Sequence, residues 1–273
     1  MSGLDGARVA LLETRMSAEA AALVRRNGGE PYCVQAVRES VVDCAEDAAA
    51  LIDNLAGGLC GIVVFTTGVG VEALCREAER QKRLESLLES LRRVTMVCRG
   101  PKPAGALMRR GVRVSIAIAE PYTTAELLDA LSGLDVAHKG VAVVHYGERS
   151  ASLAESLLSR GARLQELCLY EWRMPEDTGP LRELVSEIIA GRVDAVAFTS
   201  QAQARHLFRV AEETAQADAL AQALNTRTVV AAVGPTCAAA LKKLAVTPRV
   251  VPEHPKMGHM VVALARYIEQ HPL

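Results

Sequence analysis

The chain has 273 residues, half of them apolar and fewer than a quarter charged, which is typical of a folded protein with room for two domains. Its 31 basic and 32 acidic residues leave a formal net charge of -1, so it lacks the basic excess of a general nucleic-acid binder. No stretch approaches the roughly 20 apolar residues that a membrane span needs. The N-terminus also lacks the basic-then-apolar order of a signal peptide, so we expect neither nucleic-acid nor membrane partners.

The seven cysteines are scattered, odd in number and without any C-x-x-C pair. A disulfide framework or a zinc site needs close, paired cysteines, so the pattern predicts reduced thiols and a cytoplasmic protein. His254 and His259 are five residues apart, a spacing that fits no metal pair on one helix face. The sequence therefore predicts no metal site.

Apolar runs and turn residues define the predicted elements of the first half. Strands are expected at residues 9–12, 32–37, 61–65, 94–98 and 112–116. Helices are expected at residues 18–26, 42–55, 69–80, 86–91, 101–110 and 124–131. Gly28 follows the first of these helices, and Pro101 suits the first turn of a later one.

The second half repeats that order. Strands are expected at residues 141–144, 163–169, 195–198, 228–233 and 249–251, with helices at 150–158, 181–189, 202–213, 235–244 and 257–268. Two motifs recur at nearly the same separation: Phe65-Thr66-Thr67 with Phe198-Thr199-Ser200, and Arg99-Gly100-Pro101 with Val233-Gly234-Pro235. Two copies of one α/β unit therefore fill the chain.

Strands that alternate with helices predict right-handed crossovers and parallel sheets covered on both faces. Ligands of such sheets bind at the carboxyl ends of the strands. Hydroxyls, glycines and helix amino termini gather there, and they suit carboxylate or phosphate groups. Arg99 and Lys102 flank one of these turns and are candidate anion contacts. The other residues at these ends are Arg15, Thr66, Thr67, Gly100, Tyr170, Thr199, Ser200, Gly234, Pro235 and Thr236.

Gly68, Gly70 and Ala73 fit the dinucleotide pattern G-x-G-x-x-A after a strand. The pattern follows a central strand, its second copy has no glycine, and Arg99 stands where an NAD site would need an acid. A tight strand-to-helix turn explains the glycines better. A nucleotide-dependent enzyme is therefore the weakest functional alternative.

Several short motifs occur in a fixed order along the chain: Glu13-Thr14-Arg15, Val64-Phe65-Thr66-Thr67-Gly68-Val69, Arg99-Gly100-Pro101-Lys102-Pro103, Leu169-Tyr170, Ala197-Phe198-Thr199-Ser200, Val233-Gly234-Pro235-Thr236 and Pro252-Glu253-His254-Pro255-Lys256-Met257-Gly258. Each motif is short, but their order and spacing together resemble the uroporphyrinogen-III synthase family over essentially the whole chain. The resemblance implies an α/β fold of two similar flavodoxin-like or Rossmann-like parallel-sheet domains, joined by a two-strand connector, with a cleft between them. The implied boundaries are residues 1–37 and 175–273 for domain 1, 41–169 for domain 2, and 38–40 and 170–174 for the connector.

The resemblance further implies a cofactor-independent lyase, a hydro-lyase of heme, siroheme and cobalamin biosynthesis, that acts as a monomer. Its substrate would be hydroxymethylbilane, a linear tetrapyrrole that closes to uroporphyrinogen III with ring D inverted. Tyr170 would be the catalytic residue, with its hydroxyl helping water to depart. The expected substrate-binding residues are Arg15, Thr66, Thr67, Gly68, Arg99, Gly100, Lys102, His145, Thr199, Ser200, Gln201, Gly234, Pro235 and Thr236. Of these, the resemblance implies that Thr66, Thr67, Gly68, Thr199, Ser200, Gln201, Pro235 and Thr236 line the cleft, largely through backbone amides.

Two departures from the family pattern bear on these roles. Many relatives carry an arginine-glycine pair where this chain has His145-Tyr146-Gly147-Glu148, and Pro103 stands where relatives often have threonine. The alternative function is a non-catalytic, two-lobed sensor or regulatory module for tetrapyrrole-like small molecules. The presence of Tyr170 favours the enzyme.

Overall fold

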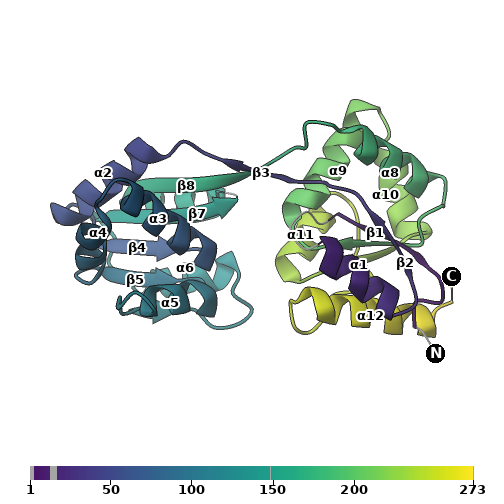
Figure 1. The fold of residues 1–273 in the computed structure, drawn as a ribbon, viewed down its shortest axis with the longest axis horizontal. Coiled ribbons are helices and arrows are strands. Elements are labelled where there is room, and N and C mark those ends of the chain that lie inside the picture. Colours follow the sequence, from purple (N-terminus) through teal and green to yellow (C-terminus); the bar gives the residue numbers. More distant parts are fainter. Residues whose placement is uncertain (1–2, 13–16, 148, 273) are drawn as a thin grey trace. The chain divides into compact units, whose positions relative to one another are not determined.

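The computed structural model describes residues 3–12, 17–147 and 149–272. The chain divides into two compact units: unit 1 is Met1–Arg38 with Arg173–Leu273, and unit 2 is Glu39–Trp172. Each unit contains a mainly parallel sheet with helices on both faces, as Figure 1 shows. This confirms the predicted fold class.

The sheet of unit 1 has the strand order β10-β9-β1-β2, and all its strand pairs are parallel. The strands are β1 (Arg8–Leu11), β2 (Glu30–Cys33), β9 (Ala195–Phe198) and β10 (Val229–Ala232). In β1, Val9 lies opposite both Pro31 and Ala195. The first strand of the chain is therefore paired with a strand from each half of the sequence.

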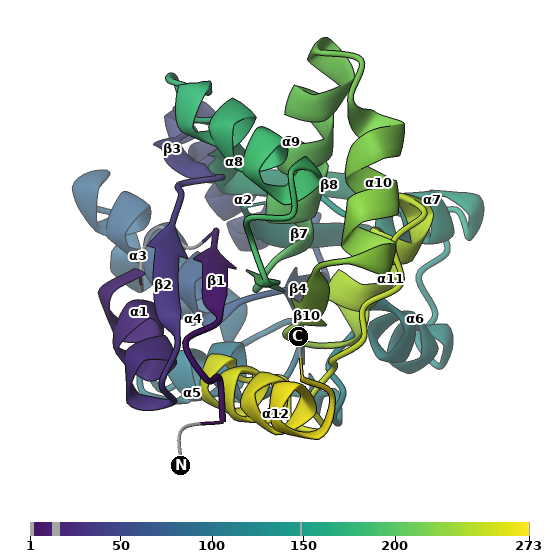
Figure 2. The same ribbon diagram turned by 90° about the vertical axis from the view of Figure 1, so that its right-hand side faces the viewer.

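In the described part of unit 1, six helices cover this sheet. They are α1 (Ser17–Arg26), α8 (Gly179–Ile189), α9 (Gln201–Glu213), α10 (Ala217–Thr226), α11 (Pro235–Lys243) and α12 (Met257–Gln270). On one face, Val24 of α1 and Leu264 of α12 belong to one core with Ala195 and Ala231. Figure 2 shows α1 and α12 on that face and α8, α9 and α10 on the other.

The sheet of unit 2 has the order β3-β8-β7-β4-β5-β6. Its strands are β3 (Arg38–Val41), β4 (Ile62–Phe65), β5 (Thr95–Cys98), β6 (Ile116–Ala117), β7 (Gly140–Gly147) and β8 (Arg163–Arg173). β4 is buried along its whole length, which explains its unbroken run of isoleucine, valine and phenylalanine.

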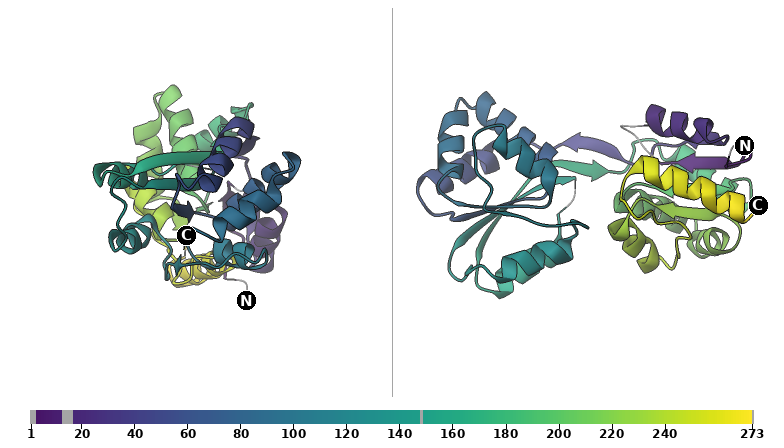
Figure 3. Two further views of the ribbon diagram at one scale, coloured as in Figure 1. Left: turned by 90° about the vertical axis from the view of Figure 1, so that its left-hand side faces the viewer. Right: turned by 90° about the horizontal axis from the view of Figure 1, so that it is seen from below.

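Two helix layers enclose the sheet of unit 2, which lies between them in the right panel of Figure 3. The first layer packs Leu51, Leu74 and Leu107 against Phe65, and the second packs Leu127 against the other face. The first layer consists of α2 (Ala45–Ala56), α3 (Gly68–Arg80), α4 (Leu84–Leu91) and α5 (Pro101–Met108). The second consists of α6 (Thr124–Ser132) and α7 (Ala151–Ser159).

Several predicted element boundaries were wrong. The strand expected at 32–37 is β2, which ends at Cys33 because its partner β1 ends at Leu11. The strand expected at 112–116 is reduced to β6, and the one expected at 249–251 to a single bridge between Val250 and Ala231. The helix expected from residue 42 begins at Ala45, since the Val42 N–H donates to the Leu169 carbonyl instead. α10 was not predicted at all.

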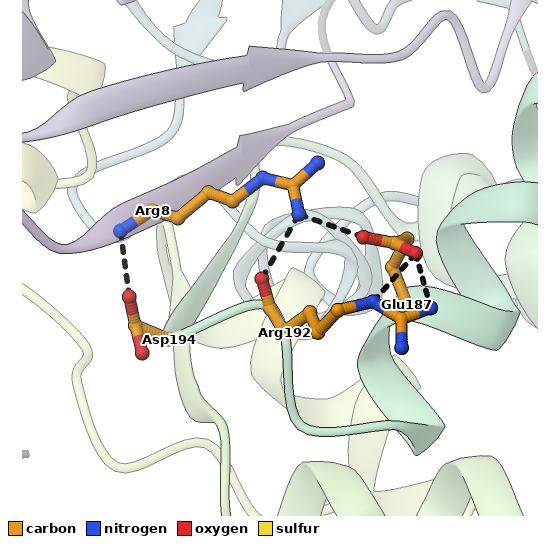
Figure 4. Close-up of polar contacts among 4 residues, drawn as sticks. All are labelled: Arg8, Glu187, Arg192 and Asp194. Carbon is orange, nitrogen blue, oxygen red and sulfur yellow. Dashed lines mark hydrogen bonds and ion pairs between the residues drawn. The ribbon is translucent and has the colours of Figure 1, made fainter.

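A charged cluster fixes the amino end of β1 within unit 1 (Figure 4). Arg8 Nη1 donates to Glu187 Oε2 at 2.7 Å, and the Arg8 backbone N–H donates to Asp194 Oδ2 at 2.7 Å. Glu187 Oε1 also accepts from Arg192 Nε at 2.9 Å. Hydrogen bonds from Arg192 and Arg8 lower the pKa of Glu187 to about 2.

We expect Glu187→Gln to lower the thermal unfolding midpoint of unit 1 at pH 7, because an amide cannot neutralise the two guanidinium groups. The ordinary pKa of this carboxyl is 4.5, so its contribution is complete above that pH and is lost as the pH falls toward 2. Thermal unfolding of both proteins between pH 7 and pH 2.5 measures this. Glu212→Gln, at an exposed position of α9, is the matched control. A stability difference that stays constant down to the acid limit would contradict the assignment.

Candidate active site

The carboxyl end of β4 is tied to its neighbours by two threonines. Thr66 is buried, and both its hydroxyl and its N–H donate to the Val144 carbonyl, at 3.1 and 3.2 Å. Thr67 caps α3 by accepting the Gly70 N–H at 3.0 Å. A Cβ added to Gly68 would lie 2.9 Å from the Lys102 carbonyl oxygen, so glycine here lets α3 approach the first turn of α5. This packing, together with the cap, accounts for the turn that resembles a dinucleotide motif.

Arg99 brings a positive charge to the same edge. It follows β5, is half-buried, and donates from Nε to the Thr66 carbonyl at 3.1 Å. Burial lowers the pKa of the Arg99 guanidinium from its ordinary value, although an arginine stays protonated. Gly100 has φ +95°, with the Tyr122 ring against it, and Lys102 is exposed in the first turn of α5. Unit 2 therefore brings together Thr66, Thr67, Gly68, Arg99, Gly100 and Lys102.

His145 is buried near the end of β7, and only 1% of its side chain is exposed. Its Nε2 lies 2.8 Å from Glu166 Oε1 on β8, whereas its Nδ1 has no hydrogen-bond partner within the described part of the chain. Desolvation lowers the pKa of His145, opposed by Glu166. The imidazole is therefore neutral at pH 7, with Nε2–H donating to Glu166. The His145 side chain is therefore buried at the end of β7 and joined to β8 through Glu166.

Tyr170 is aimed by an irregularity in β8. His145 lies opposite Cys168, whereas Gly147 lies opposite Glu171, so two steps of β7 face three steps of β8. The extra residue is a β-bulge. Regular alternation would place Leu169 and Tyr170 on opposite faces of the sheet. Instead both pack with the core beneath α2 and α3, and both line one pocket.

This pocket, called here the Tyr170 pocket, has a volume of about 600 Å³ and lies within unit 2. Its walls come from α3, from the residues just before α2 and from the end of β8. Among the described residues that line it, Tyr170 is the only member of the predicted site. Sequence reasoning missed the rest of this pocket, because nothing in the order of motifs connects α3 to β8.

In unit 1, the predicted residues after β9 form a complete capping box. Ser200 caps α9 by accepting the Gln203 N–H at 3.4 Å. Gln203 Oε1 accepts the N–H groups of Thr199 and Ser200, at 2.7 and 3.2 Å, and its Nε2 donates to Thr199 Oγ1 at 2.9 Å. These two backbone amides are therefore already bonded within the protein, which leaves the Ser200 and Thr199 side chains and the amides further into α9 as the groups of this turn that a substrate could contact. The S-x-x-Q spacing of a capping box was the sequence signal for Gln203.

The remaining predicted residues lie at the start of α11 or outside the described structure. Gly234 is buried in extended backbone, and a Cβ added to it would lie 2.8 Å from Pro255 Cβ. Pro235 and Thr236 are exposed at the first turn of α11. The edge of unit 1 thus brings together Thr199, Ser200, Gln201, Gly234, Pro235 and Thr236. Arg15 lies outside the described residues.

No group of three or more histidine, cysteine, aspartate or glutamate side chains in the described chain could hold a metal ion. His254 and His259 contact each other edge to face, with ring centroids 5.4 Å apart. No helix in the described residues has the length and apolar character to cross a membrane.

Two parallel α/β units, each with hydroxyl-capped helices at the carboxyl edge of its sheet, define a duplicated α/β protein of the ligand-binding type. Residues 18–262 match the family described as uroporphyrinogen-III synthase HemD, and the chain belongs to this family. The family supports a place in tetrapyrrole biosynthesis.

Individual proteins agree with the family match. A mutant uroporphyrinogen III synthase from the extremely thermophilic bacterium Thermus thermophilus superposes with a TM-score of 0.80 and 28% identity, covering 97% of this chain and 100% of that one. The wild-type protein in another crystal form gives a TM-score of 0.63 at 28% identity, covering 98% and 100%. A Bacillus subtilis (strain 168) protein named "Uncharacterized protein YjjA" is 31% identical over 268 residues, 98% of each chain.

The buried imidazole makes stability depend on pH. Because desolvation lowers the pKa of His145 below its ordinary 6.5, the unfolded chain binds a proton that the folded chain resists. We expect the free energy of unfolding of the native protein to fall as the pH drops below about 6.5. His145→Gln keeps a hydrogen-bond donor for Glu166 but does not titrate, so its free energy of unfolding should fall less over the same pH range. Urea denaturation between pH 8 and pH 5 tests this. Parallel pH profiles for the two proteins would contradict it.

Gln203 is expected to contribute stability through its two accepted hydrogen bonds. Gln203→Met leaves the Thr199 and Ser200 N–H groups without that acceptor and should cost about 1–3 kcal/mol. Gln203→Glu keeps a carboxyl acceptor at the same place and should cost less. Denaturant unfolding of both variants measures the two losses. Equal losses would show that the acceptor does not matter.

Proposed function

We propose that the chain is a uroporphyrinogen-III synthase, which cyclises hydroxymethylbilane to uroporphyrinogen III and water, with ring D inverted and without a cofactor. The family match over residues 18–262 supports this function. The proposed chemistry depends on one residue, Tyr170. Its bulged strand end places the phenol beside a pocket large enough to receive part of a substrate.

In the proposed reaction, the C–O bond of the substrate's hydroxymethyl group breaks and the hydroxyl leaves as water, taking up a proton. Tyr170 donates a hydrogen bond to that departing oxygen. The resulting azafulvene is attacked by the already substituted carbon of ring D, which forms a spiro intermediate. Fragmentation and recombination then form the final C–C bond, and the closing pyrrole releases a proton. Such a self-reactive substrate needs positioning more than it needs a nucleophile.

The carboxyl edges of both sheets are proposed to bind substrate carboxylates. The exposed or half-buried members are suited to direct contact: Thr67, Gly68, Arg99, Lys102, Thr199, Ser200, Gln201, Pro235 and Thr236. Arg15 belongs to the proposal from the sequence alone. The buried members Thr66, Gly100, His145 and Gly234 are proposed to hold the strand ends in place. A cytoplasmic, monomeric enzyme is part of the same proposal, and the seven free cysteines fit a reducing compartment.

The test is a product assay with Tyr170→Phe beside the native protein. Freshly generated hydroxymethylbilane is supplied, the products are oxidised, and the type I and type III isomers are separated by chromatography. We expect mainly type III from the native protein and a loss of rate on the order of 100-fold in the variant, because the phenol's hydrogen bond is absent.

Tyr267→Phe is the matched control, since Tyr267 is a half-buried tyrosine of unit 1 stacked on His271. It should leave product and rate unchanged. If the native protein yields only the type I isomer, at the rate of a protein-free control, the proposed enzymatic function is wrong and the sensor function is favoured.

A further inference from the structure

Of the four charged residues that line the Tyr170 pocket in the described structure, Glu77 and Arg80 form an ion pair with each other. Glu77 of α3 accepts two hydrogen bonds from Arg80, from Nε at 3.0 Å and from Nη2 at 2.7 Å, and another from Gln81 Nε2 at 2.7 Å. Arg80 is the first cause of the lowered pKa of Glu77. These two pocket residues therefore neutralise each other and leave little capacity for a ligand.

Arg76 lies one helical turn before Arg80 and lines the same pocket. It is exposed, and within the described part of the chain it makes no ion pair or side-chain hydrogen bond. Asp43, on another wall, is exposed, and its Oδ1 accepts the Ala45 N–H at the start of α2 at 3.4 Å. Within the described residues neither Arg76 nor Asp43 has an ion-pair partner, so the pocket contains the guanidinium of Arg76, the carboxylate of Asp43 and the phenol of Tyr170.

A guanidinium offers paired N–H donors in a plane that matches a carboxylate. The bulge in β8 is what brings this donor set together, since it places Tyr170 on the face of the sheet that α3 covers. We propose that Arg76 binds a carboxylate group of the substrate in the Tyr170 pocket. This rests on the proposed function, and it gives Arg76 the task of orienting the part of the substrate whose hydroxyl departs beside Tyr170.

Steady-state kinetics of Arg76→Gln and Arg76→Lys test the role in turnover. We expect Arg76→Gln to raise KM about tenfold with a smaller change in kcat, because a charged hydrogen-bond donor to the substrate is lost. Arg76→Lys keeps the charge without the paired donors, so its KM should lie between those of the native protein and Arg76→Gln. Arg113→Gln, an exposed arginine of unit 2 without a described side-chain partner, is the control. An unchanged KM in Arg76→Gln would overturn the proposal.

A binding measurement separates this inference from the proposed activity. The probe is uroporphyrin I, a stable tetrapyrrole with eight carboxylates, and the signal is quenching of Trp172, the chain's single tryptophan, two residues beyond Tyr170. We expect Arg76→Gln to weaken binding about tenfold relative to the native protein, and the difference to shrink at high salt. This result would support carboxylate binding by Arg76 in the Tyr170 pocket even if no type III isomer were formed. Equal affinities of the native and variant proteins, or no binding by the native protein, would overturn it.

Discussion

Unit 1 depends on the hydrogen bonding of β1 between β9 and β2. Arg8 and Asp194 contact each other across 186 positions of sequence, and Leu11 lies opposite Ala197 at the other end of the ladder. A four-residue strand forms few backbone hydrogen bonds, so the ion pair between Arg8 and Glu187 helps to fix its register. Without β1, β9 would keep only β10 as a partner and β2 would have none.

The two copies of the repeated turn have similar sequences but use their polar groups differently. Thr67 and Ser200 both cap a helix, so in each copy one hydroxyl serves the fold. Three residues after each cap the copies differ. Gln203 accepts hydrogen bonds from two backbone N–H groups, whereas its equivalent, Gly70, has no side chain to do so. Duplication has therefore preserved the architecture of the strand ends while changing which donors remain for a ligand.

Local patterns predicted the repeated α/β order because strands, helices and their turns are encoded by neighbouring residues. They did not predict the β-bulge in β8, which arises only when β7 and β8 pair, and so they left the direction of Tyr170 open. Helical spacing predicts the pair of Glu77 with Arg80 and would equally allow Glu72 to pair with Arg76. The fold shows that Glu72 pairs with Arg110 instead. His145 was predicted among the binding residues, and the local pattern did not indicate that its side chain would be buried and bonded to Glu166 on the neighbouring strand.

The discontinuity of unit 1 has a consequence for synthesis on the ribosome. All the strands of unit 2 come from the single segment Glu39–Trp172, so this unit can form while the remaining chain is still being translated. β1 leaves the ribosome early, yet its partner β9 begins only at Ala195. At about 5–20 residues per second, β1 and its early partner β2 wait on the order of 10–40 s before β9 is synthesised. During nascent-chain elongation, the edge of β1 that later pairs with β9 is therefore open to chaperones and to misassociation.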